Sequence, residues 1–262
     1  MNCFLRVAAL PLDIVQGDKD ANLDAVERAL SLLPPGTDLV VLPELFSTGY
    51  TDDPDILSKL AERNTQSTVD RIKSWAAKTG AAFAGSFLAY THPHVYNRGF
   101  FIEPSGEETF YDKHHLFSIS REAKVFSSGT TPPSVVRFRG WSISLIVCYD
   151  LRFPVWCRNR VDGYDLLLVV ANWPAARAYA WEHLLIARAI ENQCCVVGAN
   201  RSGNDKFGSY DNLTYIFDSR GMAIGVQPTG SPFIVADLDG ARQDSYRKAF
   251  PVLGDADSYY LS

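Results

Sequence analysis

The sequence lacks any long uninterrupted hydrophobic run, any excess of basic residues and any repeat or low-complexity tract. Its longest wholly apolar stretch, Leu166–Ala171, is far shorter than the roughly 20 residues that span a bilayer as a helix. The net charge is −5 at pH 7, which argues against a nucleic-acid-binding surface or a basic membrane patch. We therefore expect no nucleic acid and no membrane among its partners, and a small metabolite as its ligand.

The chain also lacks a recognisable secretion signal and a disulfide framework. Arg6 interrupts the first apolar residues and no basic region precedes them, so this segment is interpreted as a strand. Five cysteines, an odd number without framework spacing, favour reduced thiols and a cytoplasmic location. Cys194 and Cys195 lie in a predicted strand and should point to opposite faces of it. No Pro-, Gly- or Ser-rich linker divides the chain, so we expect one domain over residues 1–262.

Apolar strands alternate with amphipathic helices, and hairpin patterns interrupt this alternation in the middle and near the end. The predicted strands are Phe4–Leu10, Asp38–Leu42, Ala81–Phe87, Asn97–Glu103, Glu108–Asp112, Val135–Phe138, Trp141–Val147, Asp165–Ala171, Cys194–Ala199, Thr214–Asp218, Met222–Val226 and Phe233–Leu238. The predicted helices are Ala21–Leu33, Thr68–Lys78 with Gly80 as its C-cap, one after Arg152, and Arg177–Gln193. Strands without polar interruption need burial on both faces, which predicts an α/β fold of two mixed sheets packed face to face, with helices outside.

Three segments place a polar side chain directly after an apolar strand. These are Glu44 after Leu39–Pro43, Lys113 after Thr109–Asp112, and Cys148 after Leu145–Val147. Each has an ordinary explanation when it is taken alone. Glu44 could cap a helix or be solvated in a loop, Lys113 could be a surface lysine, and a cysteine in an apolar run is more often an inert core residue.

Together, these residue types complete the chemistry for attack on a carbonyl or nitrile carbon. A free thiol has a pKa near 8.5, so only a few per cent is thiolate at neutral pH. A nearby carboxylate can accept the thiol proton and later pass it to the leaving group. A positive charge and a backbone N–H can stabilise the oxyanion by roughly 3–4 kcal/mol per good donor. The adjacent His114 and His115 cannot readily share one ion and no further ligand cluster exists, so we expect no metal.

The segments Leu42–Phe46, Tyr111–Phe117 and Val147–Pro154 resemble, in order and over nearly the whole chain, the three signature motifs of the nitrilase superfamily of carbon–nitrogen hydrolases. The resemblance implies a four-layer αββα sandwich, no cofactor and at least a homodimer.

The resemblance also implies the roles of individual residues. Glu44 would be the general base, Lys113 the oxyanion stabiliser and Cys148 the nucleophile, with the backbone N–H of Tyr149 completing the oxyanion hole. Glu122 fits the family's second glutamate, which orients the lysine or a substrate amide; the alternative is a solvated loop charge.

Within the superfamily, Asp150–Trp156, Ala171–Pro174 and Ala187–Gln193 are most similar to the bacterial omega-amidases. Those enzymes hydrolyse the terminal amide of 2-oxoglutaramate and 2-oxosuccinamate. Such a substrate keeps a free carboxylate, so its pocket needs a cation, and Arg177 at a helix start is our candidate. An exposed helix-end arginine is the alternative. Candidate pocket walls are Trp173, Phe117 and Tyr50, although aromatic residues of this kind are more often core.

Other functions remain open at this point. The same three residue types could serve an N-carbamoyl amide hydrolase, a deaminated glutathione amidase or a nitrilase, and a non-catalytic binding protein could keep the fold. Relatives usually carry Tyr-x-Gly-x-Ser before the late hairpin, whereas this chain has Asn212 in place of the glycine. Asn can adopt the left-handed backbone that Gly supplies. The helix over Tyr179–Gln193 should pack one face on the sheet and present the rest to a second subunit.

Overall fold

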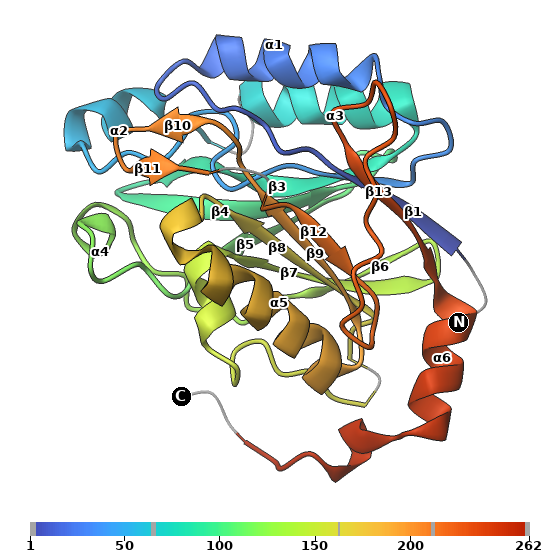
Figure 1. Ribbon diagram of the computed structural model, residues 1–262. Coiled ribbons are helices and arrows are strands. Elements are labelled where there is room, and N and C mark those ends of the chain that lie inside the picture. The colour runs from blue at the N-terminus through green and yellow to red at the C-terminus, as the bar shows by residue number, and fades with distance from the viewer. Residues whose placement is uncertain (1–3, 64–66, 162, 211–212, 260–262) are drawn as a thin grey trace.

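The computed structural model describes residues 4–63, 67–161, 163–210 and 213–259, and its centre is two mixed β-sheets packed face to face (Figure 1). The first sheet has the order β13-β1-β2-β3-β4-β5 and the second the order β12-β9-β8-β7-β6. The strands are β1 Phe4–Ala9, β2 Leu39–Val41, β3 Ala82–Thr91, β4 His94–Ile102, β5 Glu108–Asp112, β6 Val135–Phe138, β7 Trp141–Val147, β8 Leu166–Ala171, β9 Cys195–Asn200, β12 Tyr215–Phe217 and β13 Ile234–Asp239. Two further short strands, β10 Asn204–Asp205 and β11 Gly208–Ser209, form a separate hairpin.

Helices cover the outer faces of both sheets. The helices of the described residues are α1 Lys19–Leu30, α2 Pro54–Leu60, α3 Ser67–Thr79, α4 Glu122–Val125, α5 Ala178–Asn192 and α6 Gly240–Ala249. Helices α1 and α3 lie on the first sheet and α5 lies on the second, so the layers run α-β-β-α (Figure 1). The fold predicted from the strand pattern and from the family resemblance is therefore confirmed. No helix in the described part of the chain is long and apolar enough to cross a membrane.

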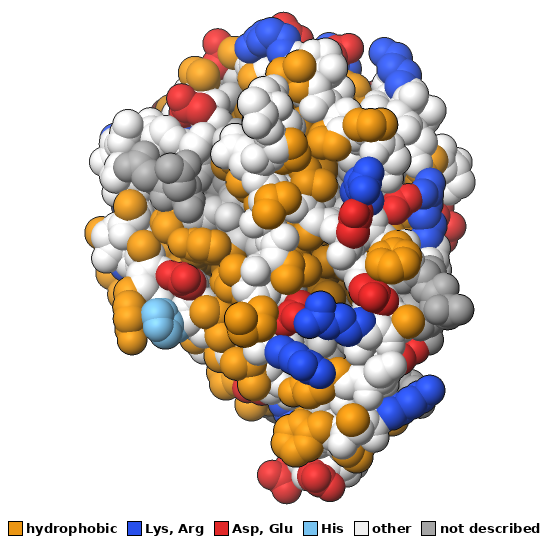
Figure 2. All heavy atoms as spheres, turned by 45° about the vertical axis from the view of Figure 1, so that its right-hand side comes forward, with side chains coloured by type: hydrophobic (Ala, Val, Ile, Leu, Met, Phe, Trp, Pro, Cys, Tyr) orange, Lys and Arg blue, Asp and Glu red, His pale blue; other side chains and the backbone are white. Residues whose placement is uncertain are grey.

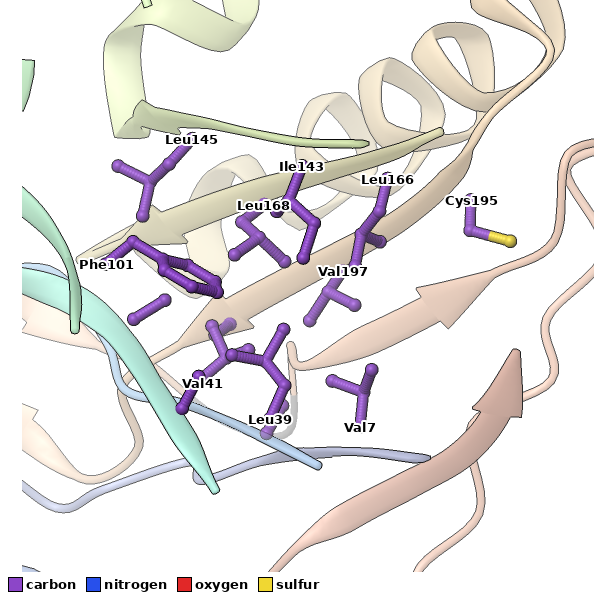
Figure 3. Close-up of a cluster of buried hydrophobic side chains, with 14 of the residues drawn as sticks. Val7, Leu39, Val41, Phe101, Ile143, Leu145, Leu166, Leu168, Cys195 and Val197 are labelled. Atoms are coloured by element: carbon purple, nitrogen blue, oxygen red, sulfur yellow. The ribbon is translucent and has the colours of Figure 1, made fainter. Parts of the chain in front are cut away.

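Strand residues alternate between two different cores, which explains why so many strands are apolar throughout. In β8, Leu166, Leu168 and Val170 point between the sheets, while Leu167 and Val169 point toward α5. Figure 3 shows the inter-sheet core, where side chains from both sheets meet. Because successive strand side chains point to opposite faces, a strand with both faces covered has no position for a solvated residue.

Cys194, directly before β9, and Cys195, its first residue, follow the same rule. Cys194 belongs to the core under α5 and Cys195 to the core between the sheets, so the expectation that they point to opposite faces is confirmed. The C-cap predicted at Gly80 is confirmed as well, because this residue has φ +71° and its N–H donates to the carbonyl oxygen of Ala76.

Two element predictions were wrong. Among the described residues directly after Arg152 there is no helix of the expected kind; a short 3-10 helix, η1, occupies Cys148–Arg152 instead and turns follow it. Residues Met222–Val226 are not a strand, since they make only isolated bridges from Ala223 and Val226. The helices α2, α4 and α6 were not predicted. The substitution of Asn212 for a family glycine lies outside the described residues.

The face of the molecule in Figure 2 carries basic and acidic side chains interspersed with one another and with hydrophobic ones. This mixture agrees with the modest net charge of −5. On this face there is no continuous basic stripe of the kind that follows a nucleic-acid backbone.

Candidate active site

Four chain segments that follow strands meet at one pocket of about 190 Å³. Glu44 follows β2, Lys113 follows β5, Cys148 follows β7 and Asn172 follows β8. The complete lining is Glu44, Tyr50, Lys113, Phe117, Ser120, Glu122, Cys148, Tyr149, Arg152, Asn172, Trp173, Pro174, Arg177, Phe207 and Tyr210. The end of a strand is where side chains leave the closely packed sheet, so residues from both sheets can converge there.

A buried ammonium lies between two buried carboxylates. Lys113 Nζ is 3.1 Å from Glu44 Oε1 and 2.8 Å from Glu122 Oε1, and all three residues are at most 3% exposed. Burial alone would lower the pKa of Lys113, but the charges of Glu122 and Glu44 outweigh it and raise that pKa well above its usual range. Lys113 is therefore a fixed positive charge at neutral pH. Two of its three N–H donors are occupied by the carboxylates, which leaves one for the pocket.

Each carboxylate is also held by donors from elsewhere in the chain. Glu44 Oε1 accepts from Asn97 Nδ2 at 2.7 Å, and Glu44 Oε2 accepts from the backbone N–H of Asn172 at 2.7 Å. Glu122 accepts from the backbone N–H of Phe117. Burial, followed by the proximity of Glu44, raises the pKa of Glu122, and the Lys113 charge offsets part of that rise. The orientation of both carboxylates is thus set before any ligand enters.

Cys148 has an unusual backbone conformation at the start of η1. Its φ is +48°, in the left-handed region that non-glycine residues rarely adopt, and Leu45 next to Glu44 has φ 46°. Such conformations cost of order 1–3 kcal/mol and cluster at functional sites. Burial and the charge of Glu44 raise the pKa of Cys148 well above its usual range, and the Lys113 charge offsets only part of the rise. The sulfur is therefore held as a neutral thiol at pH 7.

The Lys113 segment packs against backbone and not only against side chains. Gly129 donates its N–H to the carbonyl oxygen of Lys113 at 2.9 Å. A Cβ at position 129 would stand 2.0 Å from the carbonyl oxygen of Asp112, so only glycine fits. This close contact between the backbone at Gly129 and the backbone at Asp112 and Lys113 fixes the position of the Lys113 main chain where it leaves β5.

Aromatic and cationic side chains form the outer wall of the pocket. The Arg177 guanidinium lies 5.4 Å from the ring centroid of Phe117, and that of Arg152 lies 4.8 Å from the ring centroid of Trp173. Within the described residues, neither guanidinium has a carboxylate partner. The wall can therefore accept a negatively charged group.

Comparison with known proteins places the chain in a family. The model of the carbon-nitrogen hydrolase family matches residues 6–248. The chain belongs to the carbon–nitrogen hydrolase family. It is 39% identical to the omega-amidase YafV of Yersinia enterocolitica, over 98% of both chains. It is 31% identical to the 2-oxoglutaramate amidase of Bacillus subtilis, over 95% of this chain and 96% of that one.

A solved structure agrees with this assignment. XC1258 of Xanthomonas campestris, a CN-hydrolase superfamily protein with an arsenic adduct in its active site, superposes with a TM-score of 0.92 and 36% identity. The alignment covers 99% of this chain and all of that one. The resemblance to the nitrilase superfamily inferred from three motifs is thus confirmed, and this carbon–nitrogen hydrolase acts on bonds other than peptide bonds.

The geometry of the hydrolase brings together every site residue that the sequence indicated. Those residues are Glu44, Lys113, Glu122, Cys148, Tyr149, Phe117, Trp173 and Arg177, and all of them line the pocket. Sequence reasoning missed Asn97, Arg152, Phe207 and Tyr210. Arg152 lies inside the third motif and could have been considered there, whereas Phe207 and Tyr210 come from a loop whose pattern gives no signal for a pocket.

The two histidines of the second motif have separate structural contacts. His114 Nδ1 donates to the carbonyl oxygen of Gly129, and His115 Nδ1 lies 2.8 Å from Asp150 Oδ1. No group of three His, Cys, Asp or Glu among the described residues could hold a metal ion.

Proposed function

We propose that this carbon–nitrogen hydrolase is an omega-amidase that cleaves the terminal amide of 2-oxoglutaramate and 2-oxosuccinamate. The observation that carries the proposal is one pocket with a thiol, an ammonium and two carboxylates at its base and, at its wall, two arginines that have no acidic partner among the described residues. A short substrate with an amide at one end and a carboxylate at the other matches that distribution of charge. The names of the relatives in Yersinia enterocolitica and Bacillus subtilis support the same substrate class.

In the first half of the reaction, Cys148 is the nucleophile. Because its pKa is raised, the thiol proton must leave during the attack, and Glu44 accepts it as sulfur bonds to the amide carbon. The oxyanion receives hydrogen bonds from the remaining N–H of Lys113 Nζ and from the backbone N–H of Tyr149. Glu44 then donates the proton to the nitrogen, the C–N bond breaks, and ammonia leaves a thioester on the sulfur.

In the second half, water replaces ammonia. Glu44 takes a proton from the water as its oxygen attacks the thioester carbon, and the same two donors stabilise the second oxyanion. The C–S bond breaks, the sulfur recovers a proton from Glu44, and the 2-oxo dicarboxylic acid leaves. Glu122 takes no proton in this scheme. It holds Lys113 at 2.8 Å and thereby sets the position of the ammonium.

The substrate's free carboxylate is placed at the outer wall. Arg177 is exposed near the end of a short 3-10 helix, and the partly buried Arg152 lies above Trp173. An arginine held against an aromatic ring keeps its N–H donors free in the plane of the guanidinium. Both arginines contribute to binding, with Trp173 and Phe117 as the supports that orient them.

The proposal is tested by a substrate panel on the purified chain. Ammonia release should have its highest kcat/KM with 2-oxoglutaramate, compared with a nitrile, an N-carbamoyl amino acid and deaminated glutathione. Cys148→Ala should release no ammonia, whereas Cys157→Ala, a buried cysteine outside the pocket, should stay active. Faster turnover of one of the other substrates would refute the omega-amidase proposal, and activity in Cys148→Ala would refute the nucleophile.

The proposed enzyme is a single-domain, cytoplasmic homodimer without a cofactor. Support for the dimer comes from exposed apolar side chains on α5, where Tyr179 is 77% and Ile190 is 48% exposed. Light scattering after size-exclusion chromatography tests it, and a monomer at micromolar concentration would contradict it.

A further inference from the structure

One buried carboxylate close to the site takes no part in the mechanism above. Asp150 is fully buried and accepts four hydrogen bonds. Its Oδ1 accepts from the backbone N–H of His115 at 2.9 Å and from His115 Nδ1 at 2.8 Å. Its Oδ2 accepts from the Tyr111 hydroxyl at 2.8 Å and from the backbone N–H of Val147 at 3.2 Å. Every strong acceptor position of the carboxylate is therefore filled by protein.

These donors belong to the two segments that carry the reacting groups. Tyr111 and His115 lie two residues before and two residues after Lys113, and Val147 directly precedes Cys148. The first segment belongs to the first sheet and the second segment to the second sheet. The Asp150 carboxylate thus connects the two sheets directly beside Lys113 and Cys148.

The contacts around this carboxylate are themselves held in place. The Tyr111 hydroxyl accepts from Trp156 Nε1 at 2.9 Å, and the His115 ring is stacked on Phe153 with 3.6 Å between centroids. Trp156 and Phe153 both lie just after η1, on the Cys148 side. The connection between the segments is therefore rigid on both sides of Asp150.

We infer that Asp150 is a positioning residue that sets the distance between the Lys113 ammonium and the Cys148 sulfur. The inference rests on the proposed roles of those two residues. Glu44 and Glu122 fix the Lys113 ammonium, and Cys148 is strained at φ +48°, so the distance from the ammonium to the sulfur depends on contacts that join the Lys113 segment to the Cys148 segment. A displacement of about 1 Å in a catalytic group can cost on the order of 100-fold in rate.

The test uses alkylation of Cys148 by iodoacetamide as a function of pH, because this reaction needs no substrate. The charges with the largest effect on the Cys148 thiol are Glu44 after β2 and Glu122 on α4, which raise its pKa, and Lys113 after β5, which lowers it. Arg152 and Arg177 lie farther out on the pocket wall. If Asp150→Asn lets Lys113 and Cys148 move apart, the thiol loses part of its stabilising positive charge. The midpoint of the plot of alkylation rate against pH should then shift upward by about 1 pH unit or more. In the same variant kcat should fall by about 100-fold, with a smaller change in KM.

A second variant keeps the test decisive if Asp150→Asn does not fold. His115→Phe retains a ring to stack on Phe153 but removes the Nδ1 donor, and it should give a smaller shift in the same direction. The matched control is Asp165→Asn. Asp165 is another largely buried aspartate that accepts from the backbone N–H of Ser142 and from Arg247, next to the opposite ends of β7 and β8.

Asp165→Asn should lower thermal stability without moving the alkylation profile. An unchanged or downward-shifted profile in the folded Asp150 and His115 variants would overturn the inference, even if both lost stability. Failure of the substrate panel with an upward shift in alkylation would refute the omega-amidase proposal and leave the positioning role standing.

Discussion

At the scale of single residues, the same residue type has different chemistry in different surroundings. Burial raises the pKa of Cys157 and Cys195 to about 12, and both thiols face packed core. The pKa of Cys148 is raised too, but this residue lines the pocket and has Lys113 and Glu44 beside it. In the proposed mechanism, the reactivity of Cys148 therefore comes from Glu44 acting as a base beside it and not from an ionised resting thiol.

The residue-scale prediction concerns the carboxylate site. Arg177→Ala should raise KM for 2-oxoglutaramate by about tenfold or more, because a charged hydrogen bond contributes roughly 1.5–3 kcal/mol. Arg177→Lys should recover only part of the loss, since an ammonium cannot make the bidentate contact. Steady-state kinetics measures both variants.

Arg220→Ala is the matched control, because Arg220 also lies over an aromatic ring, that of Tyr246, but outside the pocket. An unchanged KM in Arg177→Ala would show that Arg177 does not bind the substrate carboxylate, and Arg152 would then be the candidate. The double variant Arg152→Ala/Arg177→Ala then decides whether this wall binds the carboxylate at all.

At the scale of elements, the hairpin of β10 and β11 covers one side of the pocket. Arg201, which is fully buried, holds Asp205 of β10 at 2.7 Å, and the Tyr210 ring packs against the same guanidinium. At the tip, the rings of Phe207 and Tyr50 meet edge to face with 5.1 Å between centroids. The base of the hairpin is thus anchored by Arg201, and the Phe207 ring at its tip lines the pocket. A substitution at Phe207 should therefore change the pocket without disturbing the base of the hairpin.

The corresponding prediction is that Phe207→Ala widens the pocket. We expect KM for 2-oxoglutaramate to rise several-fold with kcat within about twofold, and longer amides to become better substrates, because the Phe207 ring lines the pocket and packs against the Tyr50 ring. Kinetics with amides of increasing chain length measures the effect. Phe250→Ala, another exposed phenylalanine, is the control. The same length preference in both variants would contradict the prediction.

Elements with a strong apolar period were predicted well, and those that depend on local turns were not. Helix α6 is mostly polar and has no periodic apolar face, although Asp239 caps it by accepting from the N–H of Arg242. Helix α2 has only seven residues, so its Asp53 cap and first-turn Pro54 were the main signals. In the described residues after Arg152, turns follow η1 where a helix was expected, and a proline at position 154 does not by itself explain the difference.

At the scale of the whole molecule, stability depends on the core between the two sheets. Leu168 lies in the middle of β8, points between the sheets and is fully buried (Figure 3). Leu168→Ala should reduce the free energy of unfolding by about 2–5 kcal/mol, through lost transfer energy and the cavity left behind. Urea unfolding measures the change.

Val135→Ala provides the comparison, because Val135 is at an edge strand and 42% exposed. We expect it to cost less than about 1 kcal/mol. Equal losses in the two variants would show that the inter-sheet core is not the main source of stability.

The amino-acid sequence by itself determined the family, the layered fold and the residue types proposed to carry the chemistry, because apolar strand patterns and three short motifs can be recognised locally along the chain. The tertiary structure decided what those residues do to one another. Glu44, Lys113, Glu122 and Cys148 are separated by up to 104 positions, and only the packing of two sheets places them in one pocket. The same packing gave Asp150, an ordinary motif residue in the sequence, its four donors from both sides of the site.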